Sequence, residues 1–111
     1  MSKIDIQTVM PQIMGYQITG TERDDVLTEM ADFLASMGMV KPTYAKAVID
    51  RENIYPTGIC TEPYPVAIPH CERDGVLKTA ILVGQTRNNG ITFQRIDDTD
   101  LNVDAKVIFM L

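Results

Sequence analysis

The sequence predicts an α/β domain in which a mixed β-sheet is flanked by helices, and three observations support this class. The composition is ordinary for a globular protein, with 45% hydrophobic and 23% charged residues. Apolar residues recur at helical spacing in residues 21–52. Runs rich in β-branched residues, VLKTAILV at 76–83 and AKVIFML at 105–111, stand in the second half. A length of 111 residues fits one domain covering 1–111.

The first twenty residues carry the weakest pattern. Ile4, Ile6 and Val9 are candidates to pack on the domain. Residues 13–18, with the sequence IMGYQI, fit a strand or an extended lead-in. The regular elements are therefore expected from about residue 13 onward.

A first helix is predicted from Thr21 to Gly38. Thr21 and Asp24 have the spacing of a capping box, with Asp in place of the usual Glu, and acidic residues suit the positive start of a helix. Gly38 is the expected C-terminal cap. The apolar face consists of Val26, Met30, Phe33, Leu34 and Met37. We expect this face to pack in the core, in preference to forming a recognition surface.

A second helix is predicted to open at Pro42 and to end before Pro56. Proline is favoured in the first turn of a helix, and the residue before a proline is pushed out of helical geometry. Tyr44 or Ala45, then Val48 and Ile49, give the apolar spacing. Arg51 should therefore lie on the last turn of a rigid helix.

The segment 51–72 holds the only histidine, both cysteines and four of the six prolines. Each proline fixes one φ angle, so the loop should be stiff. Residues 66–68 form a short apolar run that predicts a buried strand, which Pro69 ends by withholding an N–H. His70 should then follow the end of a strand, where an α/β sheet presents its ligands.

Two interpretations of this segment stay open at the level of residues. His70 is either a structural histidine bonded to a backbone carbonyl or part of an anion site formed with Arg51. Arg51 is either a phosphate-binding fork or a solvated side chain paired with Glu52 or Asp50. Cys71 is expected to be a packed thiol in preference to a reactive one.

After this segment the pattern predicts mainly strands. Asp74 and Gly75 indicate a turn, and 76–83 should be a central strand that Gly84 follows. Asn88, Asn89 and Gly90 fit the turn of a hairpin-like connection between 79–85 and 91–93. The acidic residues 97–100 are expected to form a solvated loop, and 105–111 to form a buried strand.

Charge, cysteine content and hydropathy argue against several functional classes of protein. The net charge is −5 and no basic face is visible in the sequence, which argues against nucleic-acid binding. Two cysteines and one histidine supply neither a disulfide framework nor the ligands of a structural metal site. The apolar runs are too short to span a membrane, and the N-terminus lacks a signal-peptide core. These features predict a soluble, cytoplasmic protein without a metal.

The motifs of this segment resemble a known family. Arg51-Glu52, then Pro56-Thr57-Gly58, then Val66-Ala67-Ile68-Pro69-His70, are similar to the type 2 enzyme IIA domains, the mannitol/fructose class, of the bacterial phosphoenolpyruvate-dependent sugar phosphotransferase system. Cys71-Glu72 after the histidine is similar to the galactitol-type branch. The element order fits over nearly the whole chain.

The resemblance implies a phosphoryl carrier. His70 would accept a phosphoryl group on Nε2 from the phosphocarrier protein HPr and pass it to a cysteine of a IIB component, for uptake of galactitol or a related sugar. Arg51, Thr57 and the Thr57-Gly58 backbone would hold the phosphoryl oxygens. The alternative for Gly58 is that it only makes the turn. The step needs no cofactor, because both donor and acceptor are protein side chains.

The resemblance also leaves alternatives. The same fold serves as a phosphorylation sensor in nitrogen or transcription control, and a non-catalytic interaction module with a structural His70 is a further possibility. Members of the family continue past this point with C-terminal helices that cover one sheet face. We therefore expect a sandwich that is incomplete on one side, and an association into homo-oligomers in this form.

Overall fold

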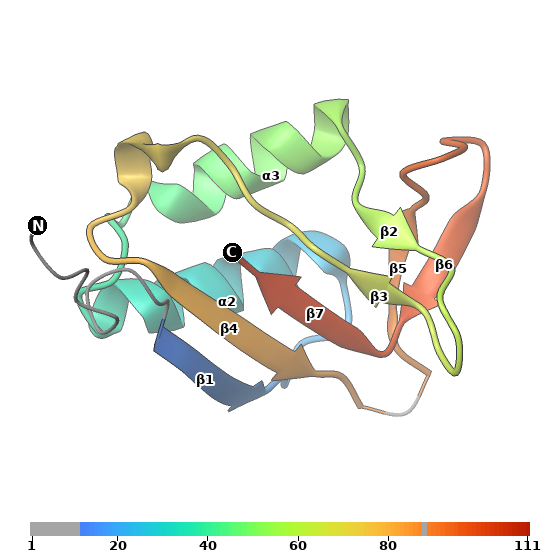
Figure 1. The fold of residues 1–111 in the computed structure, drawn as a ribbon, viewed down its shortest axis with the longest axis horizontal. Coiled ribbons are helices and arrows are strands. Elements are labelled where there is room, and N and C mark those ends of the chain that lie inside the picture. Colours follow the sequence, from blue (N-terminus) through green and yellow to red (C-terminus); the bar gives the residue numbers. More distant parts are fainter. Residues whose placement is uncertain (1–11, 88) are drawn as a thin grey trace, which may run out of the picture.

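The structure is a computed structural model that describes residues 12–87 and 89–111, and its centre is a five-stranded mixed sheet. The strand order is β1-β4-β7-β3-β2, and β5 and β6 form a separate two-stranded ribbon (Figure 1). Parallel pairs (β1 with β4, β3 with β7) alternate with antiparallel pairs (β4 with β7, β2 with β3). The bounds are β1 Gln12–Gln17, β2 Gly58–Ile59, β3 Val66–Ala67, β4 Ala80–Gln85, β5 Ile91–Gln94, β6 Asn102–Ala105 and β7 Val107–Met110. The predicted mixed α/β sheet is confirmed.

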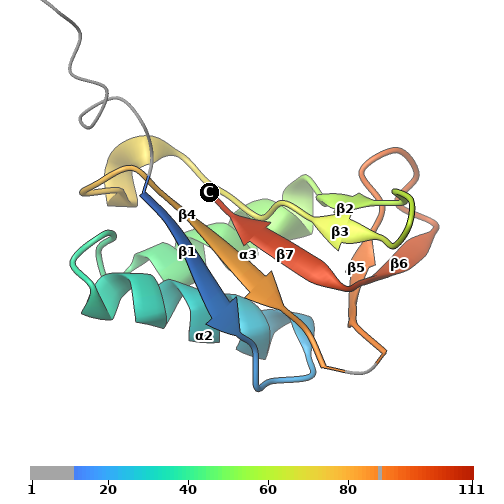
Figure 2. The same ribbon diagram turned by 60° about the horizontal axis from the view of Figure 1, so that its bottom comes forward.

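Two helices, α2 (Arg23–Ser36) and α3 (Tyr44–Ile54), lie together on one face of this sheet (Figure 2). Both were predicted, although each begins two residues after its expected start. The predicted capping box is wrong, because α2 begins after Glu22 and has no side-chain cap. Gly38 has a φ of +73° just past the end of α2, as expected of a C-terminal glycine.

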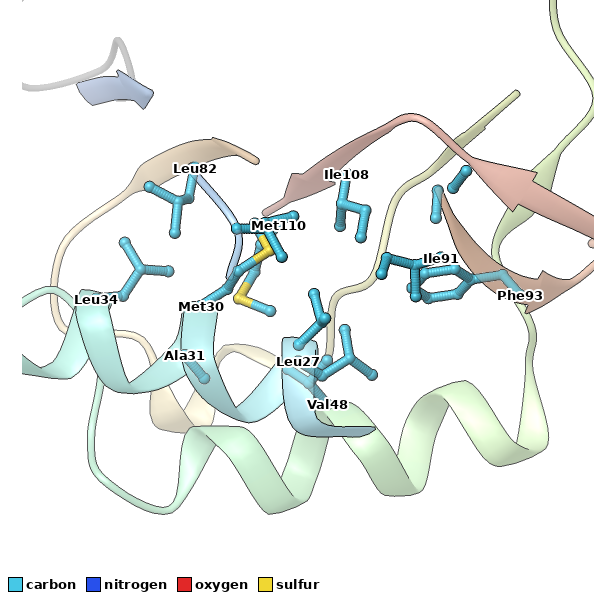
Figure 3. Packing of buried hydrophobic residues seen from close by; sticks show 14 of the residues in the cluster. Leu27, Met30, Ala31, Leu34, Val48, Leu82, Ile91, Phe93, Ile108 and Met110 are labelled. Atoms are coloured by element: carbon cyan, nitrogen blue, oxygen red, sulfur yellow. The ribbon is translucent and has the colours of Figure 1, made fainter. Parts of the chain in front are cut away.

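The core lies between the helices and the sheet. Side chains from α2, α3, β4, β5 and β7 converge there (Figure 3). Val26, Met30 and Leu34 are buried as predicted, Phe33 is half-buried, and Met37 is wrongly assigned because it is 47% exposed. The apolar face of α2 is therefore used for packing in the core, as expected.

Three strand predictions need correction. The strand expected at 76–83 starts only at Ala80, and Gly84 lies inside it. A Cβ atom on Gly84 would lie 2.7 Å from Cδ1 of Ile18 and 2.8 Å from Cε of Met30, so this glycine makes room for packing and does not end the strand.

The other two corrections concern strand pairing. β5 pairs with β6 and not with β4, so the turn at Gly90 does not close a hairpin between 79–85 and 91–93. The run 105–111 is divided at Lys106 between β6 and β7, which belong to different sheets. The acidic residues 97–100 are exposed, as expected, and Ile4, Ile6 and Val9 lie outside the described residues.

The second face of the sheet has no described helix packed on it. Alternation along β4 and β7 points Leu82 and Met110 into the core and leaves their neighbours on the opposite face. On this second face, which we call the open sheet face, apolar residues of neighbouring strands lie side by side. The pairs are Ile13 with Ile81, Val83 with Phe109, and Val66 with Val107. In the described part of the chain, the sandwich is thus covered on one side only.

Candidate functional site

His70 lies three residues after β3, at the end of the strand that pairs with β7. Its Nδ1 is 2.8 Å from the carbonyl oxygen of Ile68. Because a carbonyl can only accept, Nδ1 carries the proton and donates it, and Nε2 keeps its lone pair. The ring is half-buried and lines a cavity of about 270 Å³. The hydrogen bond of Nδ1 therefore fixes the orientation of the ring, and Nε2 carries the lone pair.

Arg51 lies on the last turn of α3, as predicted. Its Nη1 is 3.2 Å from Oε1 of Glu72, and its guanidinium lies 4.6 Å from the centre of the Tyr55 ring. Its Nε is buried and has no hydrogen-bond partner among the described residues. The predicted alternative partners, Glu52 and Asp50, are not the ones it contacts, since Asp50 pairs with Lys46.

The contact between Arg51 and Glu72 joins the last turn of α3 to the segment that carries His70. Both residues line a cavity of about 380 Å³, together with Cys71. The Glu72 side chain is 83% exposed, so water competes for this ion pair and the pair is weak. The guanidinium of Arg51 is therefore held only by a weak ion pair at Nη1, which an anion at this site can replace, while its Nε–H is closed off from the surface in this arrangement.

Glu52, the next residue along the helix, points the other way and is 1% exposed. Its Oε2 accepts the backbone N–H of Thr57 at 2.6 Å, and its Oε1 accepts the Thr57 hydroxyl at 2.8 Å. Burial raises the pKa of the Glu52 carboxyl, an effect that the Thr57 hydrogen bonds and the charge of Arg23 partly offset. We did not predict this residue, although Tyr44, Val48 and Glu52 share the buried face at four-residue spacing.

The contacts of Thr57 revise the prediction that it binds phosphate. Both of its donors are directed to Glu52, and its Oγ1 also accepts the N–H of Ile68 at 3.2 Å. The residue is 3% exposed. In this arrangement Thr57 has no donor left for a phosphoryl group, so its role is to connect elements within the fold.

Gly58 serves packing and lies in a strand, so the predicted turn at this residue is wrong. It lies in β2, where a Cβ atom would come within 2.6 Å of the carbonyl oxygen of Gln94. Its own carbonyl accepts the N–H of Ile96 at 2.8 Å. The close approach of the β5–β6 ribbon to β2 therefore requires glycine here.

The two cysteines are free thiols, one exposed and one half-buried. Burial raises the pKa of the Cys71 thiol, so this group stays protonated and weakly nucleophilic near neutral pH, which agrees with the predicted packed thiol. Within residues 12–87 and 89–111, no three side chains of His, Cys, Asp or Glu are grouped as metal ligands.

Comparison with known proteins decides the family. The profile of the phosphoenolpyruvate-dependent sugar phosphotransferase system EIIA 2 family matches residues 13–111. The chain belongs to this family. It is 35% identical over 94 residues to the galactitol-specific EIIA components of three Escherichia coli strains, an alignment covering 85% of this chain. The chain spans 61% of the length of these EIIA relatives.

Solved structures of EIIA proteins share the fold. Mannitol IIA from Escherichia coli superposes with a TM-score of 0.67 at 22% identity, covering 98% of this chain and 70% of that one. The complex of mannitol IIA with phosphorylated IIB from Escherichia coli gives 0.66 at 22% identity, covering 97% and 68%. Nitrogen regulatory protein IIA-Ntr from Neisseria meningitidis gives 0.60 at 18% identity, covering 87% and 62%. None of the described helices is both long and apolar enough to cross a membrane.

Proposed function

We propose that this chain is a cytoplasmic phosphoryl carrier of the sugar phosphotransferase system, acting as one domain over residues 1–111. His70 takes a phosphoryl group from HPr and transfers it to a cysteine of a IIB component, in the uptake of galactitol or a related sugar. The observation that carries the proposal is the Nδ1 hydrogen bond of His70 to Ile68, which leaves the lone pair on Nε2. The galactitol-specific relatives support the substrate class, and the mannitol complex supports the IIB partner.

The proposed step is an in-line displacement at phosphorus. The lone pair of His70 Nε2 attacks, the nitrogen–phosphorus bond of the donor's phosphohistidine breaks, and its electron pair returns to the donor imidazole. Arg51 lies at the end of α3, where its guanidinium is held only by the exposed ion pair with Glu72, and it supplies charge to the phosphoryl oxygens. Thr57 and Gly58 support the site without touching the phosphoryl group.

The test is phosphorylation of the purified chain with phosphoenolpyruvate, enzyme I and HPr, followed by intact mass and mapping of acid-labile phosphate. We expect one phosphoryl group on His70, and none after His70→Ala. Cys71→Ala is the matched control and should still be phosphorylated. Uptake by the His70→Ala variant would contradict the site. No uptake by this chain, nor by a version extended to the length of the relatives, would favour an interaction module.

We also propose that this form self-associates through the open sheet face. Ile81, Val83, Val107 and Phe109 on that face are only half-buried, and β1 is an edge strand of the five-stranded sheet. Light scattering during size-exclusion chromatography should give a dimer or larger species that Val83→Lys dissociates. Thr92→Lys on the exposed side of β5 is the control. A monomer at all concentrations would contradict this proposal.

A further inference from the structure

Hydrogen bonds on both sides of Ile68 link the buried Glu52 to the ring of His70 through the backbone of that residue. Glu52 accepts both donors of Thr57, at 2.6 and 2.8 Å. Thr57 Oγ1 accepts the N–H of Ile68 at 3.2 Å. The carbonyl of Ile68 accepts Nδ1–H of His70 at 2.8 Å. Each hydrogen bond in this series pairs an N–H or O–H donor with an oxygen acceptor.

The direction of the Ile68 carbonyl follows from this path. Thr57 holds the N–H of Ile68, while Pro69 restricts the ψ angle of Ile68 to extended values. With the N–H fixed and ψ restricted, the carbonyl can point in few directions. Ala67 and Pro69, on either side, are both buried, which prevents the segment from rotating as a whole.

We propose that Glu52 and Thr57 are positioning residues that set the tautomer of His70 through Ile68. The proposal rests on the proposed function for its catalytic consequence. The path places the proton on Nδ1 and the lone pair on Nε2, which is the atom that must attack phosphorus. Neither Glu52 nor Thr57 touches the phosphoryl group.

The path also predicts which chemical change breaks it. The hydroxyl of Thr57 bonds to both Glu52 and Ile68. Thr57→Val keeps the shape and removes the hydroxyl, whereas Thr57→Ser keeps the hydroxyl and removes a methyl group. Thr19 offers a matched control, because its hydroxyl donates to Glu29 at 2.9 Å in a corner with no bond to His70.

The experiment is long-range proton–nitrogen NMR of the ring. His70 is the only histidine, so its two nitrogens are assigned without ambiguity. The wild-type chain, Thr57→Ser and Thr19→Val should show the tautomer protonated at Nδ1. Thr57→Val should shift toward the mixture of a free imidazole, and its phosphoryl uptake from HPr should be slower by about tenfold because the nucleophile is misaligned.

The outcomes separate this proposal from the proposed function. A folded Thr57→Val chain that keeps the wild-type tautomer and rate would overturn the positioning role. Should Thr57→Val unfold, Glu52→Gln gives the second test, since it alters the hydrogen bonds to Thr57 without changing the size of the side chain. A wild-type tautomer in that variant would also overturn the proposal. A wild-type chain that takes up no phosphoryl group would contradict the proposed function, while the tautomer comparison would still decide the positioning role.

Discussion

Two corners of this protein use a helix glutamate in the same way and with different results. At the corner between β1 and α2, Glu29 accepts the hydroxyls of Tyr16 and Thr19 and the backbone N–H groups of Thr19 and Gly20, at 2.7 to 2.9 Å. At the corner between α3 and β2, Glu52 accepts only the hydroxyl and N–H of Thr57. Both glutamates join a helix to a neighbouring loop.

The pKa values of the two carboxyls move in opposite directions. Burial raises the pKa of Glu29, but its hydrogen bonds more than offset this and lower it overall. For Glu52, burial prevails and the pKa is raised. Hydrogen-bond donors favour the charged carboxylate, and burial favours the protonated carboxyl. The balance between the two decides the direction of each pKa shift. The Glu29 corner only stabilises the fold, whereas the Glu52 corner is also linked through Thr57 and Ile68 to His70, the proposed nucleophile.

The largest expected effect is the loss of stability in Glu52→Ala. The change leaves the buried N–H and hydroxyl of Thr57 without an acceptor, which should lower the free energy of unfolding by about 3 kcal/mol. Glu29→Ala should cost about 1 kcal/mol, because water can reach this half-buried corner. Urea unfolding measures both, with the exposed Asp32→Ala as control. A larger loss in Glu29→Ala would reverse the comparison.

Arg51→Ala should affect transfer and not stability. Loss of the charge near the phosphoryl group should slow uptake from HPr by about 100-fold, equivalent to about 2.7 kcal/mol. Its exposed ion pair with Glu72 should leave the free energy of unfolding within about 0.5 kcal/mol of wild type. Arg51→Lys should be intermediate, since it keeps charge without the planar fork. Rapid-quench measurement of phosphoryl uptake decides this, and a wild-type rate in Arg51→Ala would remove Arg51 from the site.

The pH dependence of stability should differ in sign between the corners. The folded pKa of Glu29 lies below its ordinary value of 4.5, so its contribution is present above that value and is lost as the pH falls through the folded pKa. The folded pKa of Glu52 lies above 4.5, so the fold loses stability as the pH rises from 4.5 through the folded pKa.

Urea unfolding over a pH series tests this difference. With rising pH, the stability of wild type relative to Glu29→Gln should increase, and relative to Glu52→Gln it should decrease. Each variant serves as the control for the other. Slopes of the same sign would mean that one of the two directions is wrong.

The smallest expected effect is that of Glu72→Gln. The change removes the carboxylate that competes for Arg51, so the fraction of chains phosphorylated at equilibrium with HPr should rise by about twofold. Quantitative mass spectrometry at a fixed ratio of chain to HPr measures this fraction, with the exposed Glu22→Gln as control. A lower phosphorylated fraction would show that Glu72 supports Arg51 and does not compete with it.

Sequence patterns predicted the two helices, because helix formation depends mainly on residues that are close together in the chain. The helical spacing of Val26, Met30 and Leu34 and the glycine at position 38 located α2, and the proline before Thr57 limited α3. Strand pairing was not predictable in this way, because the partners of β5 and β7 depend on contacts far apart in the chain. Gly84 was interpreted as a strand end, although its role is to admit the side chains of Ile18 and Met30.

The candidate site shows the same division between local and long-range information. His70 and Arg51 are visible in sequence because their chemistry is distinctive and their flanking elements are local. Glu52 was not, since a charged residue is usually exposed and only the three-dimensional fold shows which side of α3 is covered. Thr57 was predicted to bind the phosphoryl group, whereas its N–H and hydroxyl both donate hydrogen bonds to Glu52.

The close approach at Gly58 restricts how the sequence of this chain can diverge. A Cβ atom there would meet the carbonyl of Gln94 at 2.6 Å, and the clash involves backbone, which no rotamer change can relieve. An alanine would push the β5–β6 ribbon away from β2, or displace the residue before it, Thr57. Residues 91–105 can therefore vary in their exposed side chains, but their backbone path is tied to the segment that orients His70, so insertions are tolerated only in the exposed loop between β5 and β6.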